Sequence, residues 1–192
     1  MIGSSFLEII GGHFISSLLY ALNCTTFSSV SASTNTAFPF PQIVTRTGEP
    51  TGNTATSTTA DQISFSGILK ETGAIASVSL GSGHKSVPGQ NGLTWIINGE
   101  DGVIKLESPD STIQMIDPVL TVNGEVVQAA PAGADAESPQ LSAPGNEGNI
   151  ARGWANYTRG SGYTTIEDAL GAKRVVDAVL RSAAEGVRVD LA

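Results

Sequence analysis

Two residues near the start of the chain have reactive side chains, the imidazole of His13 and the hydroxyl of Ser16. An imidazole titrates close to neutral pH, so a histidine can act as an acid or a base when other groups orient it. His13 follows two glycines and precedes an apolar run, which places it near the first turn of a predicted helix. There the ring either points toward a ligand or bonds the local backbone. We take His13 as the sole candidate for catalysis, and His13 and Ser16 as candidates for substrate binding.

A second group of candidate residues follows a later predicted strand. His84 and Lys85 come after the end of that strand, and with Trp95 they could border a pocket, so Trp95 is the third candidate for substrate binding. The alternative is an exposed loop and a tryptophan of the core. Two histidines and one cysteine, widely separated in sequence, give no metal motif. The serines lack a positioned base and the Gly-x-Ser-x-Gly turn of a hydrolase nucleophile.

The element that carries His13 is predicted to be a short apolar strand, residues 8–10, that turns into an amphipathic helix, residues 13–22. Gly11 and Gly12 would permit a sharp reversal between them, because glycine has no Cβ. The apolar side chains of the helix form one stripe that faces a core: Phe14, Ile15, Leu18, Leu19 and Leu22. No Lys or Arg precedes this run, and it is too short to span a bilayer. We therefore interpret it as a core helix rather than a signal peptide.

Most of the remaining chain is predicted to form an antiparallel sheet. Apolar and polar residues alternate in short runs separated by turns that contain glycine, which is typical of strands joined by hairpins. The predicted strands are residues 26–32, 42–47, 61–70, 74–80, 93–97, 103–106, 120–122, 126–128 and 187–191. Ile63, Phe65 and Leu69 are expected to face the core. Residues 48–60 and 129–148 are predicted to be flexible surface loops.

Two further helices are predicted near the end of the chain. The first is expected to run from a cap at Asn149 to Gly160, and the second from a capping box of Thr165 and Asp168 to Gly186. The apolar residues at helical spacing in the first are Ile150, Trp154 and Tyr157. Those expected on one side of the second are Ile166, Leu170, Val176, Val179, Leu180 and Ala183.

Several short motifs, taken in their order and spacing, resemble a known family. They are Gly11-Gly-His13 with its apolar helix, and residues 27–32, 61–67, 149–152 and 167–170. Together they resemble the C-terminal domain of the glucose-fructose oxidoreductase/inositol dehydrogenase family, and within it the fungal branch that contains the repressor of the galactose regulon. The resemblance covers almost the whole chain. It implies one α+β domain, residues 1–192, with a mostly antiparallel open sheet, helices packed on one face, and no Rossmann domain.

The resemblance also has implications for catalysis and for the cofactor. Enzymes of this family use NAD(P), which the Rossmann domain holds, and an aspartate typically lies four residues before the matching histidine, with another acid often three after it. Here those positions hold Ile9 and Ser16. Glu8 lies next to the first position, but alternate strand side chains point to opposite faces, so it is not expected to replace the aspartate. The stretch Gly81-Ser-Gly-His84 lacks the third glycine of a dinucleotide fingerprint and any βαβ unit. We expect no cofactor for this chain alone, and NAD(P) in intact family members.

Composition excludes some partners. The 192 residues have a formal net charge of −8, and phosphate binding needs a basic face, so direct contact with nucleic acid is not expected. Cys24 is the only cysteine, which excludes an internal disulfide and suits the cytoplasm or the nucleus. The Asn-x-Thr patterns at Asn23 and Asn156 are short enough to occur by chance. No membrane segment is expected.

The leading hypothesis is a C-terminal substrate and oligomerisation domain that is non-catalytic alone and acts by binding a protein or a ligand. The resemblance implies a homo-oligomer through the open face of the sheet and a cofactor domain on the helical side. Two alternatives remain. The first is an NAD(P)-dependent sugar dehydrogenase of which this chain is the rear part. The second is a secreted module that binds carbohydrate on its sheet face.

Overall fold

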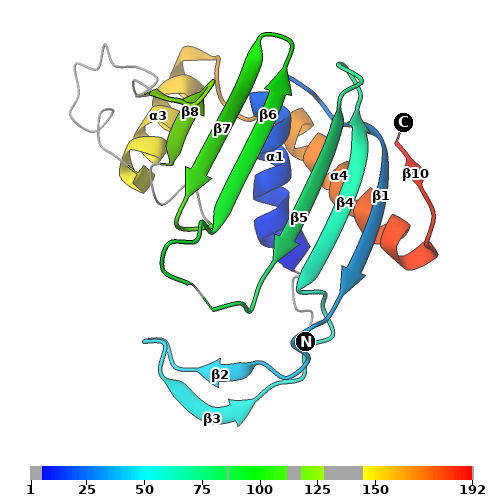
Figure 1. Cartoon of the computed structure of the whole chain (residues 1–192), viewed down its shortest axis with the longest axis vertical. Helices are drawn as coiled ribbons and strands as arrows, with labels where there is room; N and C mark the ends of the chain where they lie inside the picture. Colours follow the sequence, from blue (N-terminus) through cyan, green and yellow to red (C-terminus); the bar gives the residue numbers. More distant parts are fainter. Residues whose placement is uncertain (1–5, 86, 112–117, 128–144, 192) are drawn as a thin grey trace. The chain divides into compact units, whose positions relative to one another are not determined.

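The computed structural model describes residues 6–85, 87–111, 118–127 and 145–191 (Figure 1). The chain divides into two compact units, the first formed by Met1–His84 and Thr164–Ala192 and the second by Lys85–Tyr163. Among the helices in the described ranges, none has both the length and the apolar character needed to cross a membrane.

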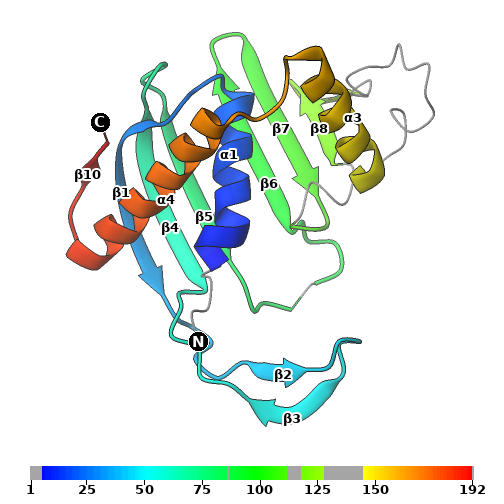
Figure 2. The same cartoon turned by 180° about the vertical axis from the view of Figure 1, so that it is seen from behind.

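The first unit contains a four-stranded antiparallel sheet with the order β10-β1-β4-β5 and a separate two-stranded sheet, β2-β3. Two helices, α1 and α4, lie on one face of the four-stranded sheet (Figure 2). The elements of this unit are η1 (Leu7–Gly11), α1 (Gly12–Ala21), β1 (Phe27–Asn35), β2 (Gln42–Val44), β3 (Pro50–Thr54), β4 (Gln62–Leu69), β5 (Ile75–Gly81), α4 (Ile166–Glu185) and β10 (Val189–Asp190).

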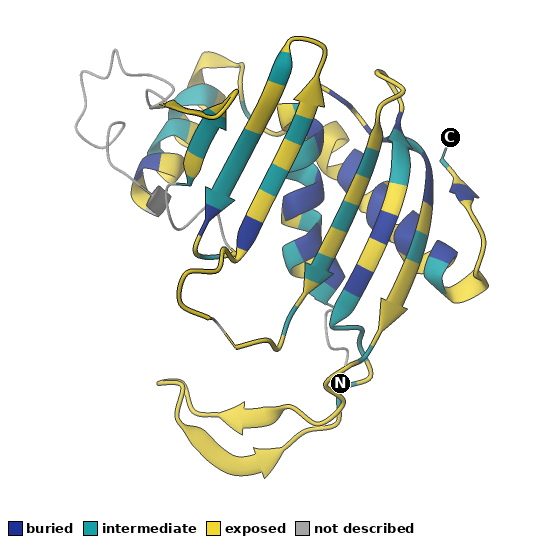
Figure 3. Cartoon of the chain, viewed as in Figure 1, coloured by how far each residue is buried: buried dark blue, intermediate teal, exposed yellow. Residues whose placement is uncertain are grey.

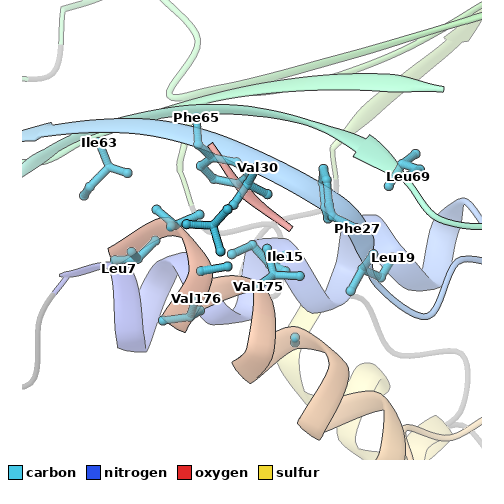
Figure 4. Close-up of a cluster of buried hydrophobic side chains, with 14 of the residues drawn as sticks. Leu7, Ile15, Leu19, Phe27, Val30, Ile63, Phe65, Leu69, Val175 and Val176 are labelled. Carbon is cyan, nitrogen blue, oxygen red and sulfur yellow. The ribbon is translucent and has the colours of Figure 1, made fainter. Parts of the chain in front are cut away.

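The core of the first unit lies between this sheet and its two helices. Ile63, Phe65 and Leu69 of β4 are each at most 2% exposed, which confirms their predicted inward orientation. The rings of Phe27 and Phe65 pack edge to face with their centroids 6.1 Å apart. Figure 4 shows the helix side chains that meet them: Ile15, Leu19, Val175 and Val176. Burial of a side chain of this size contributes about 1.5–3 kcal/mol, so the core fixes both helices on the sheet.

Residues 8–10, predicted to be a strand, are helical. Leu7–Gly11 forms a π-helix that continues directly into α1, and Gly11 and Gly12 have right-handed helical φ values of −61° and −59°. The predicted reversal is therefore wrong. A Cβ on Gly11 would lie 2.7 Å from Leu7 Cδ1 and 3.2 Å from Leu80 Cδ1. Gly11 thus supplies space for close packing against β5, not freedom to turn. The predicted stripe of α1 is confirmed, with Phe14, Ile15 and Leu19 buried and Leu18 and Leu22 partly buried.

The ends of α4 are those predicted, but its buried face is different. Thr165 and Asp168 form the capping box, and Gly186 ends the helix with φ of 69°. Three apolar residues predicted on the core side are exposed: Ile166, Leu170 and Leu180. The buried residues of α4 are Gly171, Ala172, Val175, Val176, Ala178, Val179 and Ser182. The glycine, the alanines and the serine among them are small, so this side of α4 can approach the sheet closely. Close packing therefore determines which side of α4 faces the core.

Residues 48–60, predicted to be a loop, contain a strand. β3 pairs antiparallel with β2, with Gln42 opposite Thr54 and Val44 opposite Pro50. Every residue of both strands is exposed. Apolar alternation reports burial of one face rather than backbone pairing, so the sequence pattern gave no signal for this strand.

The described residues of the second unit form an antiparallel sheet in the order β6-β7-β8-β9 and the helix α3. Its elements are β6 (Leu93–Gly99), β7 (Gly102–Ser108), β8 (Val119–Val122), β9 (Glu125–Val127) and α3 (Gly145–Arg159). The strands predicted at 93–97 and 103–106 pair as one hairpin, and those at 120–122 and 126–128 as another. Asn123 and Gly124 have the positive φ values, 52° and 87°, of a primed turn.

The helix α3 begins at Gly145, four residues before the predicted cap. Asn149 is inside the helix, where its Oδ1 accepts a hydrogen bond from Arg152 Nη2 at 2.7 Å. Residues 129–144 of the predicted loop lie outside the described residues. The strand pairs of the described ranges are all antiparallel, and with helices on one face of the first sheet this confirms the α+β class.

Candidate functional site

His13 and Ser16 lie one turn apart on α1, at its solvent-facing side. His13 is exposed and Ser16 is partly buried. Ile9, one turn before His13 in the same continuous helix, is 48% exposed. The position four residues before His13 therefore holds a branched alkyl side chain, which can neither accept a proton nor orient an imidazole. Within the described part of the chain, the His13 ring has no hydrogen-bond partner.

Glu8, the carboxylate nearest to His13 in sequence, forms an ion pair with α4. Its Oε1 lies 3.7 Å from Lys173 Nζ, which also contacts Asp177 Oδ1 at 2.7 Å. The hydrogen bond to Asp177 is the largest cause that raises the pKa of Lys173, and against desolvation the charge of Asp177 and then that of Glu8 add to it. The predicted reason for excluding Glu8, strand alternation, is wrong because the segment is helical. The ion pair supplies a different reason, since it draws the carboxylate toward α4.

His84 lies at the end of the first unit beside Phe38. Its Nε2 is 3.1 Å from Gln62 Oε1, and its ring packs edge to face on Phe38 with centroids 5.5 Å apart. A Cβ on Gly83 would lie only 2.6 Å from Phe38 Cδ2, and a Cβ on Gly81 would lie 3.2 Å from His84 Nε2. The glycine-rich stretch 81–84 is therefore filled by aromatic rings.

This packing bears on the cofactor that the family resemblance implies. A dinucleotide fingerprint exposes backbone N–H groups at a strand-to-helix turn, where a pyrophosphate can approach. In this chain the glycines of residues 81–84 lie under side chains, and the next described element is the strand β6. The described residues do not fit the pyrophosphate of NAD(P), and we derive no chemical step through that cofactor. The described residues also contain no group of three or more His, Cys, Asp or Glu arranged to hold a metal ion.

Trp95 and Lys85 belong to the second unit. Trp95 lies on β6, partly buried, in a cross-strand row with Leu106 and Leu120. Lys85 is exposed. Trp95 therefore shares one apolar face of the second sheet with these two leucines.

The structure also shows an exposed aromatic cluster that the sequence analysis did not identify as a site. Trp154 and Tyr157, which were predicted to fall at helical spacing, lie on α3 and are 66% and 60% exposed. Their ring centroids are 6.0 Å apart, and Tyr163 lies 5.3 Å from Tyr157. Exposed aromatic rings that also carry a polar group are typical of binding surfaces.

A second missed feature is a surface on the outer side of the first sheet, which we call the serine face. It consists of two cross-strand rows of exposed serines, Ser31-Ser66-Ser77 and Ser33-Ser64-Ser79, contributed by β1, β4 and β5. The burial colours of Figure 3 show exposed positions alternating along these strands. The sequence contains the signal, a serine at every second position, but only the strand register aligns the serines in rows.

The comparisons with known proteins agree with this fold. Residues 1–108 match the family model described as Gal80p, C-terminal domain. The structure is similar to a super-repressor mutant of Gal80p from Saccharomyces cerevisiae, with a TM-score of 0.80 and 21% identity over 98% of this chain and 50% of that chain. It is also similar to the transcriptional regulator Gal80p from Kluyveromyces lactis, with a TM-score of 0.72 and 23% identity over 97% of this chain and 47% of that chain.

Dehydrogenases share the same fold. A levoglucosan dehydrogenase in complex with NADH and L-sorbose matches with a TM-score of 0.68 and 20% identity over 99% of this chain and 51% of that chain. In sequence, a dehydrogenase of Aspergillus oryzae, aclE, is 27% identical over 188 residues, which cover 96% of this chain and 48% of that protein. The chain spans about half the length of these relatives.

These observations define the fold class first: an α+β domain whose fold Gal80p and a levoglucosan dehydrogenase share over about half of their own length. Since the family model covers more than half of the residues, the chain belongs to the family of Gal80p C-terminal domains.

Proposed function

We propose that this chain is the substrate and oligomerisation domain of a Gal80-like protein, that it is not catalytic by itself, and that it acts by binding a protein or a ligand. The observation that carries this proposal is the set of residues around His13. Ile9 occupies the place of the family's aspartate, Ser16 that of the second acid, and Glu8 pairs with Lys173. A lone exposed imidazole lacks the groups that would orient it for proton transfer.

The serine face supports self-association as the binding mode of the first sheet. β1, β4 and β5 contain no charged residue, although the chain has a net charge of −8. Two acidic copies repel each other least where both surfaces are uncharged. The short side chains also leave the sheet smooth enough for a second sheet face to lie on it. We therefore propose a homo-oligomer formed through this face, in the cytoplasm or the nucleus.

A measurement of mass in solution tests the oligomer. Sedimentation equilibrium of the chain is expected to show a dimer or a larger assembly. Ser66→Arg places a long charged side chain in the middle of one serine row, so it is expected to shift the chain toward the monomer. Ser161→Arg is the matched control, because Ser161 is exposed and lies outside the first sheet. A monomeric wild-type chain would contradict the oligomer, and equal effects of the two variants would contradict the role of the serine face.

Calorimetry tests the absence of catalysis and of an autonomous cofactor site. Titration of the chain with NAD and with NADP is expected to give no saturable heat. The chain mixed with either cofactor and a panel of sugars is expected to form no reduced nicotinamide, measured by absorbance. Tight binding or turnover would instead support a second candidate, a sugar dehydrogenase, which the 27% identity to an Aspergillus oryzae dehydrogenase favours.

A further inference from the structure

Hydrogen bonds fix the residues at the base of the hairpin β2–β3, where it leaves the four-stranded sheet. The two carboxylate oxygens of Asp61 accept hydrogen bonds from the backbone N–H groups of Ala37 and Phe38, each at 2.8 Å. Although partial desolvation acts in the opposite direction, these two bonds hold the pKa of Asp61 below its usual value. The backbone pairing continues from Asp61 toward β2 and β3, because the Ser57 N–H donates to the Pro39 carbonyl at 2.9 Å. The base therefore directs the hairpin away from the sheet at a defined place.

The rest of the hairpin is not covered. Residues 37–56, which we call the arm, are all exposed. Figures 1 and 2 show the arm extending beyond the end of β1 and β4, the neighbouring strands that it connects. Besides Phe38, which packs on His84, three large apolar side chains lie along the arm: Phe40 is 68% exposed, Ile43 44% and Val44 53%. A lone two-stranded hairpin is at best marginally stable in water, and clustered exposed apolar groups mark a contact surface.

We propose that the arm lies on a second copy of this chain, where Phe40, Ile43 and Val44 pack beside the partner subunit's sheet face. This inference rests on the self-association proposed above. In a two-fold dimer each subunit gives one arm and receives one, so the contact is made twice.

The area of the sheet supports this assignment. β4 has eight residues, and at about 3.3 Å per residue and 4.8 Å per strand the three strands β1, β4 and β5 present about 380 Å². A stable dimer buries about 800 Å² on each partner, so the serine face alone supplies about half. A five-residue hairpin presents about 160 Å² per face on the same spacing. Each subunit would bury its sheet face, its own arm and the surface under the partner's arm. Together these bring the buried area per subunit close to that of a stable dimer.

Charge points to the same partner. The arm contains one cation, Arg46, and one anion, Glu49, and is neutral overall. The rest of the chain carries the whole net charge of −8. An arm meant for a basic partner would be expected to carry acidic residues, whereas a neutral apolar arm suits the uncharged strands of an acidic chain's own copy.

The first experiment compares dimer dissociation constants by sedimentation equilibrium of the 192-residue chain. The double substitution Phe40→Ser with Ile43→Ser is expected to weaken the dimer at least tenfold, since buried aromatic anchors contribute most to interfaces. Ile166→Ser is the matched control, because Ile166 is equally apolar, is 78% exposed and lies on α4. Its dissociation constant is expected to equal that of the wild type. The circular dichroism of each variant is compared with that of the wild type; Phe40 and Ile43 are exposed and do not belong to the buried core, so their substitution should leave the fold intact.

The second experiment identifies the surface that the arm contacts. One chain carries Val44→Cys and a second, longer-tagged chain carries Ser66→Cys, both with Cys24→Ala. Treatment of the mixture with a short bis-maleimide is expected to give a product with the summed mass of the two different chains. A chain with both Val44→Cys and Ser66→Cys that closes only on itself would overturn the proposal, since the arm would then lie on its own sheet.

The outcomes separate this inference from the proposed oligomer. If the wild-type chain is a dimer and the arm variant dissociates no more readily than Ile166→Ser, the arm inference fails and the oligomer stands. If the wild-type chain is a monomer at 100-fold the concentration of a typical micromolar dissociation constant, both fail. A weaker dimer in the arm variant together with the mixed cross-link supports the arm.

Discussion

At Gly171 the helix α4 lies close to Thr25, in the chain after α1, and replacing this glycine tests how α4 packs there. A Cβ on Gly171 would lie 2.3 Å from the carbonyl oxygen of Thr25, about 1 Å closer than an ordinary contact between carbon and oxygen. Its backbone is helical, so alanine meets no conformational strain there. Only the lack of space opposes the substitution Gly171→Ala.

The magnitude follows from two opposing terms. Alanine in a helix is favoured over glycine by about 1 kcal/mol. Overpacking typically costs about 1–3 kcal/mol, and the upper end applies here because the obstacle is backbone rather than a flexible side chain. We therefore expect Gly171→Ala to lower the free energy of unfolding by about 2 kcal/mol. For a chain of this length that corresponds to a fall of roughly 4–8 °C in the melting temperature.

A matched control has the opposite expected sign. Gly153 is also helical, on α3, and a Cβ there would meet no atom within 4 Å. Gly153→Ala is therefore expected to stabilise its helix by about 0.5–1 kcal/mol. Urea denaturation gives the overall change, and hydrogen exchange of the peptides from α3 and α4 shows which helix responds. If Gly171→Ala is as stable as the wild type or more so, the close approach to Thr25 is not present in solution.

Two further substitutions are predicted to change stability. Ser182 is 1% exposed, and its Oγ accepts a hydrogen bond from the Ala32 N–H at 2.9 Å and donates one to the Val187 carbonyl at 2.6 Å. Ser182→Ala is therefore expected to lower the free energy of unfolding, measured by urea denaturation, by about 2–3 kcal/mol. A loss below about 0.5 kcal/mol would contradict that role. The backbone N–H and the hydroxyl of Thr165 hold the pKa of Asp168 below its usual value, so its benefit is present at neutral pH and is lost as the pH falls below about 4. Asp168→Ala is therefore expected to be about 1 kcal/mol less stable than the wild type at pH 7 and to approach it at pH 3, and a gap that widens at low pH would refute this reasoning.

Much of the fold could be predicted because the relevant signals are local. In β4 the alternation of Ile63 and Phe65 with serines identified both the strand and its buried face, since side chains of a strand alternate between faces. The capping box at Thr165 likewise placed the start of α4 without knowledge of its surroundings. The candidate site was predictable only in part: the sequence identified His13 and the missing acid at Ile9, but not the ion pair between Glu8 and Lys173.

Residues within a few positions of one another were enough to predict the strands of the two four-stranded sheets, the caps of α4 and the apolar stripe of α1. Three features came from the folded chain instead: Gly11 packs against Leu80 in a continuous helix, β3 pairs with β2 without burying a side chain, and six serines align in two rows. Those features depend on which distant segments meet and in what register, and side-chain patterns along one segment do not specify that meeting.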